Sequence, residues 1–338
     1  MKTIVLDAPG QFRLSQLEHP AAPGPGEALV RVRQIGVCGT DFHAFRGEQP
    51  FFTYPRILGH ELGVEVIATG SQEQGLMAGT HCAVRPYFNC GHCLPCRQGK
   101  TNCCVNLKVF GVHIDGGMRE YALVPSAYLH PSSTLSPEKL ALVEPLSIGA
   151  HAVARSQVTQ GERVLVVGAG PIGLAVTQFA LLAGAEVIVL DISEPRLQFC
   201  RSQWPQVVPI NGRGDALAAL QELVGEELPT LVFDATGSGQ SMQNAFNYVA
   251  HGGRLVFVGL FQGNVSFHDP DFHRRELTLY SSRNATATDF QRIIAYLEEG
   301  RINLDPWITH RASSDTMIDV FPQWFDRDSG IIKAVIEF

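Results

Sequence analysis

The chain has 338 residues, of which 45% are hydrophobic and 17% are charged, and its net charge at pH 7 is −7. This length fits two domains, and the composition fits buried cores. The negative charge and the lack of a long basic run argue against a nucleic-acid partner. The N-terminal segment MKTIVLDAPG has too short an apolar run for a signal peptide, and the longer apolar stretches are broken by Gly and charged residues. We therefore expect a cytoplasmic protein without membrane contact.

The pattern of predicted elements changes near residue 148. Before it, alternating segments separated by Gly and Pro predict strands at 28–35, 63–69 and 120–125. After it, continuous apolar strands alternate with helical patterns, beginning with RVLVVGAG and PIGLAVTQFALLAG, which predicts a parallel, doubly wound sheet. From about residue 285 the chain turns helical and then ends in the strand IIKAVIEF. We expect this last segment to rejoin the first domain.

The segment GVCGTDFH places the first candidate metal ligand just after a predicted strand. Further candidates lie in ILGHELGVEV and ALVEPLSIGAH: the three segments contribute Cys38, His60, Glu61 and Glu144. Thiolate, imidazole and carboxylate ligands with one open position define a catalytic zinc site. The spacing alone does not bring these residues together. A core cysteine and a hydrogen-bonded histidine are therefore equal alternatives at this point.

Five of the eight cysteines lie in NCGHCLPCRQGKTNCC, and four of them have the spacing C-x2-C-x2-C-x7-C. These four residues are Cys90, Cys93, Cys96 and Cys104. Four thiolates on one loop suit tetrahedral zinc and leave no open position, so we predict a closed, structural zinc site. In a reducing compartment, disulfides or a redox cluster are the less favoured alternatives. An iron–sulfur cluster is a further alternative, and Cys103 or His92 could replace a ligand.

The glycine-rich segment GAGPIG follows the strand RVLVV and opens a helix. Gly168 permits the tight turn, Gly170 lets the backbone approach a pyrophosphate, and Gly173 allows the helix to pack closely on the strand. Pro171 and Ile172 begin the helix, whose N-terminal amides and dipole favour phosphates. The segment therefore predicts a dinucleotide site.

The following strand, EVIVLD, ends at Asp191, 18 residues beyond Gly173. A carboxylate there accepts hydrogen bonds from ribose hydroxyls and repels a 2′-phosphate, which favours NAD over NADP. Arg196 weakens this preference because a cation can neutralise the region. A helix N-cap or turn role is the alternative for Asp191.

These motifs, with VIVLD and LDPWITH, occur in an order and spacing that closely resemble the zinc-dependent medium-chain alcohol dehydrogenases, in the branch of sorbitol, threonine and sugar-acid dehydrogenases. The resemblance implies an α/β fold with a chaperonin-10-like, β-rich catalytic domain and a Rossmann domain that binds NAD. The catalytic domain would comprise 1–148 and 285–338, with a zinc lobe at about 88–106, and the Rossmann domain 149–284. Two zinc ions per subunit, a small-molecule substrate and a homodimer or homotetramer are also implied.

The resemblance assigns roles to individual residues. The four candidates of the catalytic zinc site match the family's ligands, with Glu144 binding zinc directly or through its water. Asp41 matches the acid that orients His60, and Thr40 and His43 match a proton relay. Lys333 matches a basic residue near the cofactor pyrophosphate, and Arg196 matches one near the adenosine ribose.

The substrate is less well defined by the sequence. Arg119 and Arg283 lie near motif residues and are candidate substrate contacts, because cations suit a carboxylate such as that of a hexonate. Asn284 is a candidate hydrogen-bond partner of the cofactor or substrate. A surface or structural role is the alternative for each arginine.

We therefore expect a zinc-dependent enzyme that transfers a hydride from a secondary hydroxyl of a polyol or sugar acid to NAD. Oxidation of an amino-alcohol, as by L-threonine 3-dehydrogenase, is the nearest alternative. Zinc-free NADPH reductases of the same fold lack Cys38, His60 and the four-cysteine lobe. A non-catalytic nucleotide-binding protein is an alternative from a different class, against which the intact Thr40 and His43 pair argues.

Overall fold

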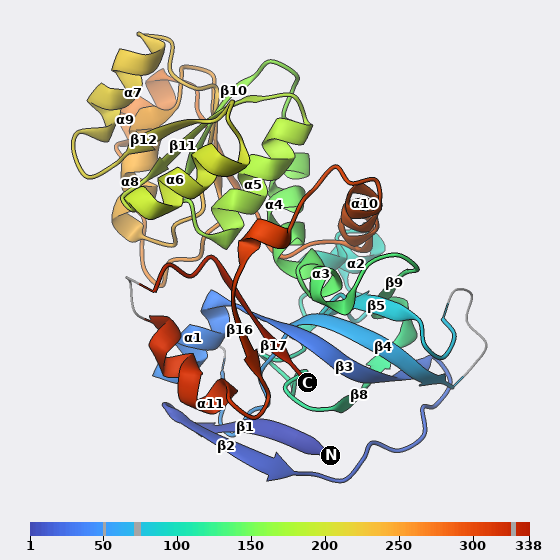
Figure 1. Ribbon diagram of the computed structural model, residues 1–338. Helices are drawn as coiled ribbons and strands as arrows, with labels where there is room; N and C mark the ends of the chain where they lie inside the picture. The colour runs from blue at the N-terminus through green and yellow to red at the C-terminus, as the bar shows by residue number, and fades with distance from the viewer. Residues whose placement is uncertain (50–51, 71–75, 326–328) are drawn as a thin grey trace. The chain divides into compact units, whose positions relative to one another are not determined.

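The computed structural model describes residues 1–49, 52–70, 76–325 and 329–338. The chain divides into two compact units, Met1–Pro145 with Ala285–Phe338, and Leu146–Asn284 (Figure 1). No helix within the described ranges is long and apolar enough to cross a membrane.

The first unit is built on a seven-stranded sheet with the order β16-β17-β3-β4-β5-β9, in which β8 also pairs with β3. The strands are β3 (Glu27–Val37), β4 (Glu61–Thr69), β5 (His81–Val84), β8 (Tyr121–Pro125), β9 (Leu129–Ser132), β16 (Ile308–Ser313) and β17 (Lys333–Glu337). Two small sheets pair β1 (Lys2–Ala8) with β2 (Gln11–Gln16), and β6 (Tyr87–Phe88) with β7 (Lys108–Val109). The C-terminal strand β17 thus lies beside β3, far from it in sequence.

Helices of this unit are short apart from α10. They are α1 (Gly39–Arg46), α2 (Leu94–Arg97), α3 (Pro137–Ala141), α10 (Ala287–Glu298) and α11 (Met317–Val320). Helix α4 (Val143–Ser156) begins in the first unit and ends in the second.

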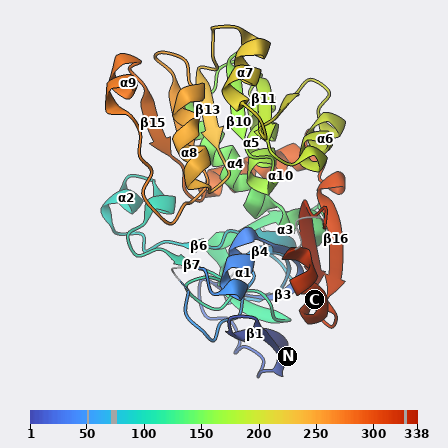
Figure 2. The ribbon, with the colours of Figure 1, turned by 90° about the vertical axis from the view of Figure 1, so that its left-hand side faces the viewer.

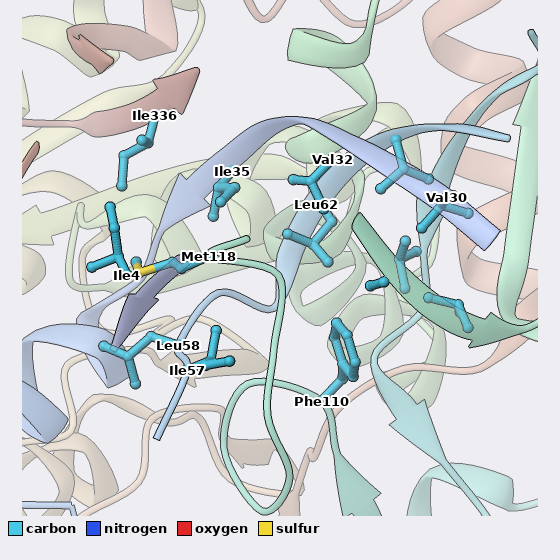
Figure 3. Packing of buried hydrophobic residues seen from close by; sticks show 14 of the residues in the cluster. Ile4, Val30, Val32, Ile35, Ile57, Leu58, Leu62, Phe110, Met118 and Ile336 are labelled. Atoms are coloured by element: carbon cyan, nitrogen blue, oxygen red, sulfur yellow. The ribbon is translucent and has the colours of Figure 1, made fainter. Parts of the chain in front are cut away.

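The core of the first unit follows from the alternation in β3, where every second side chain from Ala28 to Val32 is buried. In Figure 3, Val32 and Ile35 of β3 lie close to Leu62 of β4, and Ile4 and Met118 complete the layer. Each fully buried aliphatic side chain of this kind contributes about 1.5–3 kcal/mol. This core holds the ends of β3 and β4 in place.

The second unit is a parallel sheet of six strands with helices on its faces (Figure 2). The strands are β10 (Arg163–Val167), β11 (Glu186–Asp191), β12 (Val208–Asn211), β13 (Leu231–Asp234), β14 (Arg254–Phe257) and β15 (Thr278–Ser281). The helices are α5 (Pro171–Leu182), α6 (Glu194–Gln203), α7 (Ala216–Val224), α8 (Gly239–Ala245) and α9 (Asp269–Arg274). The order β12-β11-β10-β13-β14-β15 reverses between β10 and β13, where ligands of doubly wound sheets bind. The predicted doubly wound parallel sheet is confirmed.

A buried histidine makes the first unit sensitive to acid. His130 on β9 is 5% exposed and stacks on Phe290 of α10, with ring centroids 5.1 Å apart. Burial and the cation of Arg85 lower the pKa of His130 to about 4. The unfolded chain, in which the histidine pKa is about 6.5, therefore takes up this proton more readily. The contribution of His130 to stability is complete above pH 6.5 and is lost as the pH falls toward 4.

We expect His130→Phe to remove a pH-dependent loss of roughly 2–3 kcal/mol in the free energy of unfolding between pH 7 and pH 4. Phenylalanine keeps the ring against Phe290, and no described hydrogen bond is lost, since Nε2 of His130 has no partner among the described residues. Urea unfolding of both proteins at several pH values tests this. Equal pH dependence in the two proteins would contradict it.

Candidate metal centres and nucleotide site

Cys38, His60 and Glu61 come together where β3 ends and β4 begins. Cys38 directly follows β3 and precedes α1, while Glu61 is the first residue of β4. The antiparallel register pairs Gly36 with Glu61, which brings the two chain segments side by side. One donor atom from each of the three residues lies within 4.8 Å of the others. A thiolate, an imidazole and a carboxylate at this spacing fit zinc with a further position open.

Gly36 makes room for this arrangement. A Cβ atom at Gly36 would lie 2.1 Å from Oε2 of Glu61, so any side chain there would displace the carboxylate. Our reading of the sequence did not single out this glycine, because its role depends on a residue 25 positions away.

Asp41, on α1, contacts the backbone of Cys38 and faces the ring of His60. This fully buried carboxylate accepts a hydrogen bond from the amide of Cys38 at 2.9 Å through Oδ2. Its Oδ1 lies 3.7 Å from Nδ1 of His60. With Nδ1 facing Asp41, Nε2 is the ring nitrogen left for a metal, which is the usual arrangement of a metal-binding histidine.

Lys333 contacts this centre through Glu61. Its ammonium, 3% exposed, contacts both carboxylate oxygens of the fully buried Glu61 and donates to the carbonyl of Val37 at 2.9 Å. The pairing of β17 with β3 sets Ala334 opposite Val37 and holds Lys333 beside the start of β4. A role of Lys333 near the cofactor pyrophosphate stays a prediction.

Glu144 lies in the first turn of α4 and is buried. It accepts a hydrogen bond from the hydroxyl of Tyr87. Burial raises the pKa of Glu144 to about 7, while the charge of His60 acts in the opposite direction. Glu144 does not join the three donors that lie within 4.8 Å of one another, but it is near enough to interact with the charges of His60 and Glu61.

Thr40 and His43 lie three residues apart on α1 and therefore on one face of this helix. The ring of His43 is exposed, and its Nδ1 lies 3.1 Å from the carboxylate of Glu48. This end of the pair can exchange protons with solvent.

The four-cysteine lobe has the geometry of a closed metal site. The Sγ atoms of Cys90, Cys93, Cys96 and Cys104 all lie within 4.8 Å of one another. Tetrahedral zinc with Zn–S distances of about 2.3 Å places its sulfurs about 3.8 Å apart. The Cys93–Cys104 separation is 3.8 Å and that of Cys93–Cys96 is 3.3 Å, whereas a disulfide requires about 2.05 Å. Cys103 is exposed and lies outside this set.

The glycine-rich turn of the second unit leaves room for a phosphate. Gly168 has φ +97°, and a Cβ atom on Gly173 would lie 1.7 Å from the carbonyl oxygen of Gly168. Above Gly170, the N-cap of α5, a Cβ atom would meet only Nη1 of Arg196, at 3.8 Å. Pro171 and Ile172 form the first turn of this helix, so its amide dipoles face the open space.

Asp191 is tied to this turn by two hydrogen bonds. Its buried carboxylate accepts from the amide of Ala169 at 2.6 Å and from that of Ser193 at 2.7 Å. These bonds fix the carboxylate at the carboxyl end of β11, beside the turn, which is where a Rossmann sheet binds the ribose.

The three candidate substrate residues do not share one unit. Arg119 belongs to the first unit, where its guanidinium carbon lies 5.7 Å from the ring centroid of the buried Phe110. Burial lowers the pKa of Arg119. The Nε atom of Arg119 is buried without a hydrogen-bond partner among the described residues, and its contact with a substrate stays a prediction. Arg283 is exposed and Asn284 has φ +52°, and both end the second unit.

Tyr87 is a residue of the site that sequence reasoning missed. It is a single tyrosine in a strand of two residues, and its contact partner lies 57 residues further along. Tyr87 lies three positions before Cys90, the first cysteine of the lobe. This spacing does not indicate which way its hydroxyl points.

Two family models match the chain. The model "Alcohol dehydrogenase GroES-like domain" matches residues 24–134, and the model "Zinc-binding dehydrogenase" matches residues 171–299. Together with the donor cluster, the four-cysteine lobe and the doubly wound sheet, they define the class of nucleotide-dependent, zinc-binding oxidoreductases.

Similar proteins cover the whole chain. L-galactonate-5-dehydrogenase of Escherichia coli K12 is 42% identical over 340 residues, which are 100% of this chain and 99% of the relative. 2-Dehydro-3-deoxy-L-galactonate 5-dehydrogenase of Pseudoalteromonas atlantica is 32% identical over 94% of each chain. The crystal structure of the rspB alcohol dehydrogenase of E. coli CFT073 with NADH has a TM-score of 0.93 at 31% identity and covers 100% of this chain and 99% of that one. The chain belongs to the zinc-type, medium-chain alcohol dehydrogenases, and the predicted family, fold, enzyme class and cofactors, zinc and NAD, are confirmed.

Proposed function

We propose that the chain oxidises a secondary hydroxyl of a hexonate-like sugar acid, at its fifth carbon, and transfers the hydride to NAD. The main support is the convergence of Cys38, His60 and Glu61 in a chain that is 42% identical, along its whole length, to an L-galactonate 5-dehydrogenase. A second sugar-acid relative is also named for the 5-position.

In this proposal Cys38, His60 and Glu61 hold the catalytic zinc, with Glu144 beside it as a ligand or as a partner of bound water. When bound, zinc acts as a Lewis acid that lowers the pKa of the substrate hydroxyl. Asp41 faces Nδ1 of the His60 ring at 3.7 Å, which leaves Nε2 for the ion. Lys333 balances the charge of Glu61 in its buried position.

The proton of the substrate hydroxyl leaves along α1. Thr40 and His43 would be the protein groups of this relay, with the nicotinamide ribose hydroxyl between them, and the exposed ring of His43 would pass the proton to solvent. Glu48 orients the His43 ring, since its carboxylate lies 3.1 Å from Nδ1.

The turn containing Gly168, Gly170 and Gly173 binds the pyrophosphate of NAD at the N-terminus of α5. Asp191 accepts hydrogen bonds from the ribose hydroxyls, and Arg196 lies above the turn.

Asp191→Asn should raise the ratio of kcat/KM with NADP to kcat/KM with NAD by about 10- to 100-fold, because the repulsion of a 2′-phosphate is removed while Arg196 remains. Initial rates with both cofactors measure this ratio. Asp215→Asn is the matched control, since Asp215 caps α7 in the same unit and accepts from the amide of Ala218. An equal ratio in both variants would contradict the ribose role of Asp191.

We also infer that residues 1–148 with 285–338 form the catalytic domain, that 149–284 form the NAD-binding domain, and that the protein is a cytoplasmic homodimer or homotetramer. Light scattering of the purified protein tests the oligomeric state.

The substrate class is tested by a panel of L-galactonate, other hexonates, hexitols and L-threonine, each with NAD and with NADP. We expect kcat/KM for one hexonate with NAD to exceed that for L-threonine by about 100-fold or more. Faster turnover of L-threonine would replace the proposed substrate class. A zinc-loaded protein that binds NAD but turns over no member of the panel would favour the non-catalytic alternative.

A further inference from the structure

The hydroxyl of Tyr87 holds one oxygen of Glu144 in a fixed place. Tyr87 is 3% exposed and donates to Oε1 of Glu144. Its ring packs edge-on against the fully buried Phe290, with centroids 6.5 Å apart and an interplanar angle of 81°. Because the ring is enclosed, the hydroxyl cannot turn away from the carboxylate. One of the two oxygens of Glu144 is therefore committed to Tyr87.

The strand that carries Tyr87 is also the base of the four-cysteine lobe. Strand β6 pairs with β7, with Tyr87 opposite Val109, and the loop between the two strands contains all four cysteines. Figure 2 shows β6 and β7 leading to α2, the helix of this lobe. Closure of the loop by a metal would therefore hold the two strands together.

Side chains connect the cysteines to β6 directly. Nδ2 of Asn89, the residue after β6, lies 3.6 Å from Sγ of Cys96. The hydroxyl of Tyr128 donates to Oδ1 of Asn89 at 2.9 Å, and the ring of Tyr128 packs edge-on against Phe88 at 4.7 Å. A continuous set of contacts thus runs from the thiolates through Asn89 and β6 to the hydroxyl of Tyr87.

We propose that Tyr87 is a positioning residue that couples the two metal centres: zinc in the lobe holds β6 in place, and β6 holds Glu144 through Tyr87. This inference rests on the proposed function, in which both centres bind zinc. Loss of the lobe metal then loosens Glu144 and speeds the departure of the catalytic zinc, although the lobe contributes no ligand to it. Tyr87 touches neither metal in this scheme and acts only through Glu144.

Release of zinc to a coloured chelator tests the coupling on the fully loaded protein. Tyr87→Phe should release the catalytic zinc 10- to 100-fold faster than the unaltered protein, since losing an outer hydrogen-bond partner commonly weakens metal binding by this factor. Release from the lobe should stay unchanged. With cobalt in the catalytic site, the d–d absorption should also shift, which a purely structural effect would not produce. Tyr121→Phe is the matched control, because Tyr121 lies in the same unit on β8 and its ring packs on His19.

A second set of variants disturbs the four-cysteine lobe: Cys93→Ser alone, and Cys93→Ser combined with Tyr87→Phe. If β6 carries the coupling, Cys93→Ser speeds release of the catalytic zinc in the parent but adds little when Tyr87 is already phenylalanine. If Cys93→Ser does not fold, Asn89→Ala takes its place, because it keeps all four thiolates and removes the contact of Asn89 with Cys96. Additive effects, or unchanged release and spectrum in Tyr87→Phe, would overturn the proposal. A parent protein with fewer than two zinc ions per chain would instead contradict the proposed zinc sites themselves.

Discussion

Cys38→Ser and His60→Ala are each expected to lower kcat/KM by about 1,000-fold or more, because Lewis-acid activation of the substrate hydroxyl supplies several kcal/mol and each 1.4 kcal/mol is a factor of ten. Both side chains lie in the cluster whose donor atoms are within 4.8 Å of one another, and His60 is buried there. Removing either leaves too few protein ligands to retain the ion. Steady-state rates with a sugar acid and NAD measure the effect.

The zinc content of the same two variants gives a second measurement. Each variant should lose one of two zinc ions and keep the lobe ion, since the four cysteines of the lobe are untouched. His19→Ala is the control, because His19 is exposed and lies outside the cluster. Full activity in either variant, or activity of the parent protein after thorough chelation, would contradict the catalytic zinc.

Lys333→Met is expected to lower the free energy of unfolding by about 3–5 kcal/mol, which is the usual cost of removing one partner from a buried ion pair. Glu61 is fully buried and Lys333 is its counter-charge, so the variant leaves a carboxylate in the core without compensation. Urea unfolding of the metal-free protein, followed by circular dichroism, measures the change, because bound zinc would itself compensate the charge of Glu61.

Two further variants isolate the pair. The double variant Lys333→Met with Glu61→Gln should cost less than the sum of the two single variants, because the uncompensated charge is removed. Arg311→Met breaks an exposed pair with Glu138 in the same unit and should cost about 1 kcal/mol or less. If Lys333→Met costs no more than Arg311→Met, the buried pair does not stabilise the site.

The parts of the molecule that local patterns encode were predictable from the sequence. The parallel sheet follows from apolar strands alternating with helices, and the observed order reverses at β10 and β13 as such a sheet requires. The turn from Gly168 to Gly173 and the four-cysteine loop are each contained in short segments, so their spacing alone limits their geometry. Zinc binding by these cysteines stays a prediction, although the structure brings their sulfurs together.

The catalytic cluster required more than local pattern. Residues alone left the convergence of Cys38 and His60 open, and family resemblance assigned their roles without a geometric reason. The reason is the β3–β4 register, which pairs Gly36 with Glu61. The contact of Lys333 with Glu61 likewise had no local signal, since it follows from the β17–β3 pairing.

By itself, the sequence determined the family, the two kinds of domain, the nucleotide-binding turn and the set of residues able to bind metal. Those features depend on residue types at short spacing in the chain. Limited backbone freedom and local hydrogen bonds are enough to fix the geometry of such short segments. Only the tertiary structure decided which distant side chains meet: Cys38 with His60, Lys333 with Glu61, and Tyr87 with Glu144. Strand register and core packing set these contacts, and a shift of one residue in register would turn Lys333, Glu61 or Tyr87 to the opposite face of its strand.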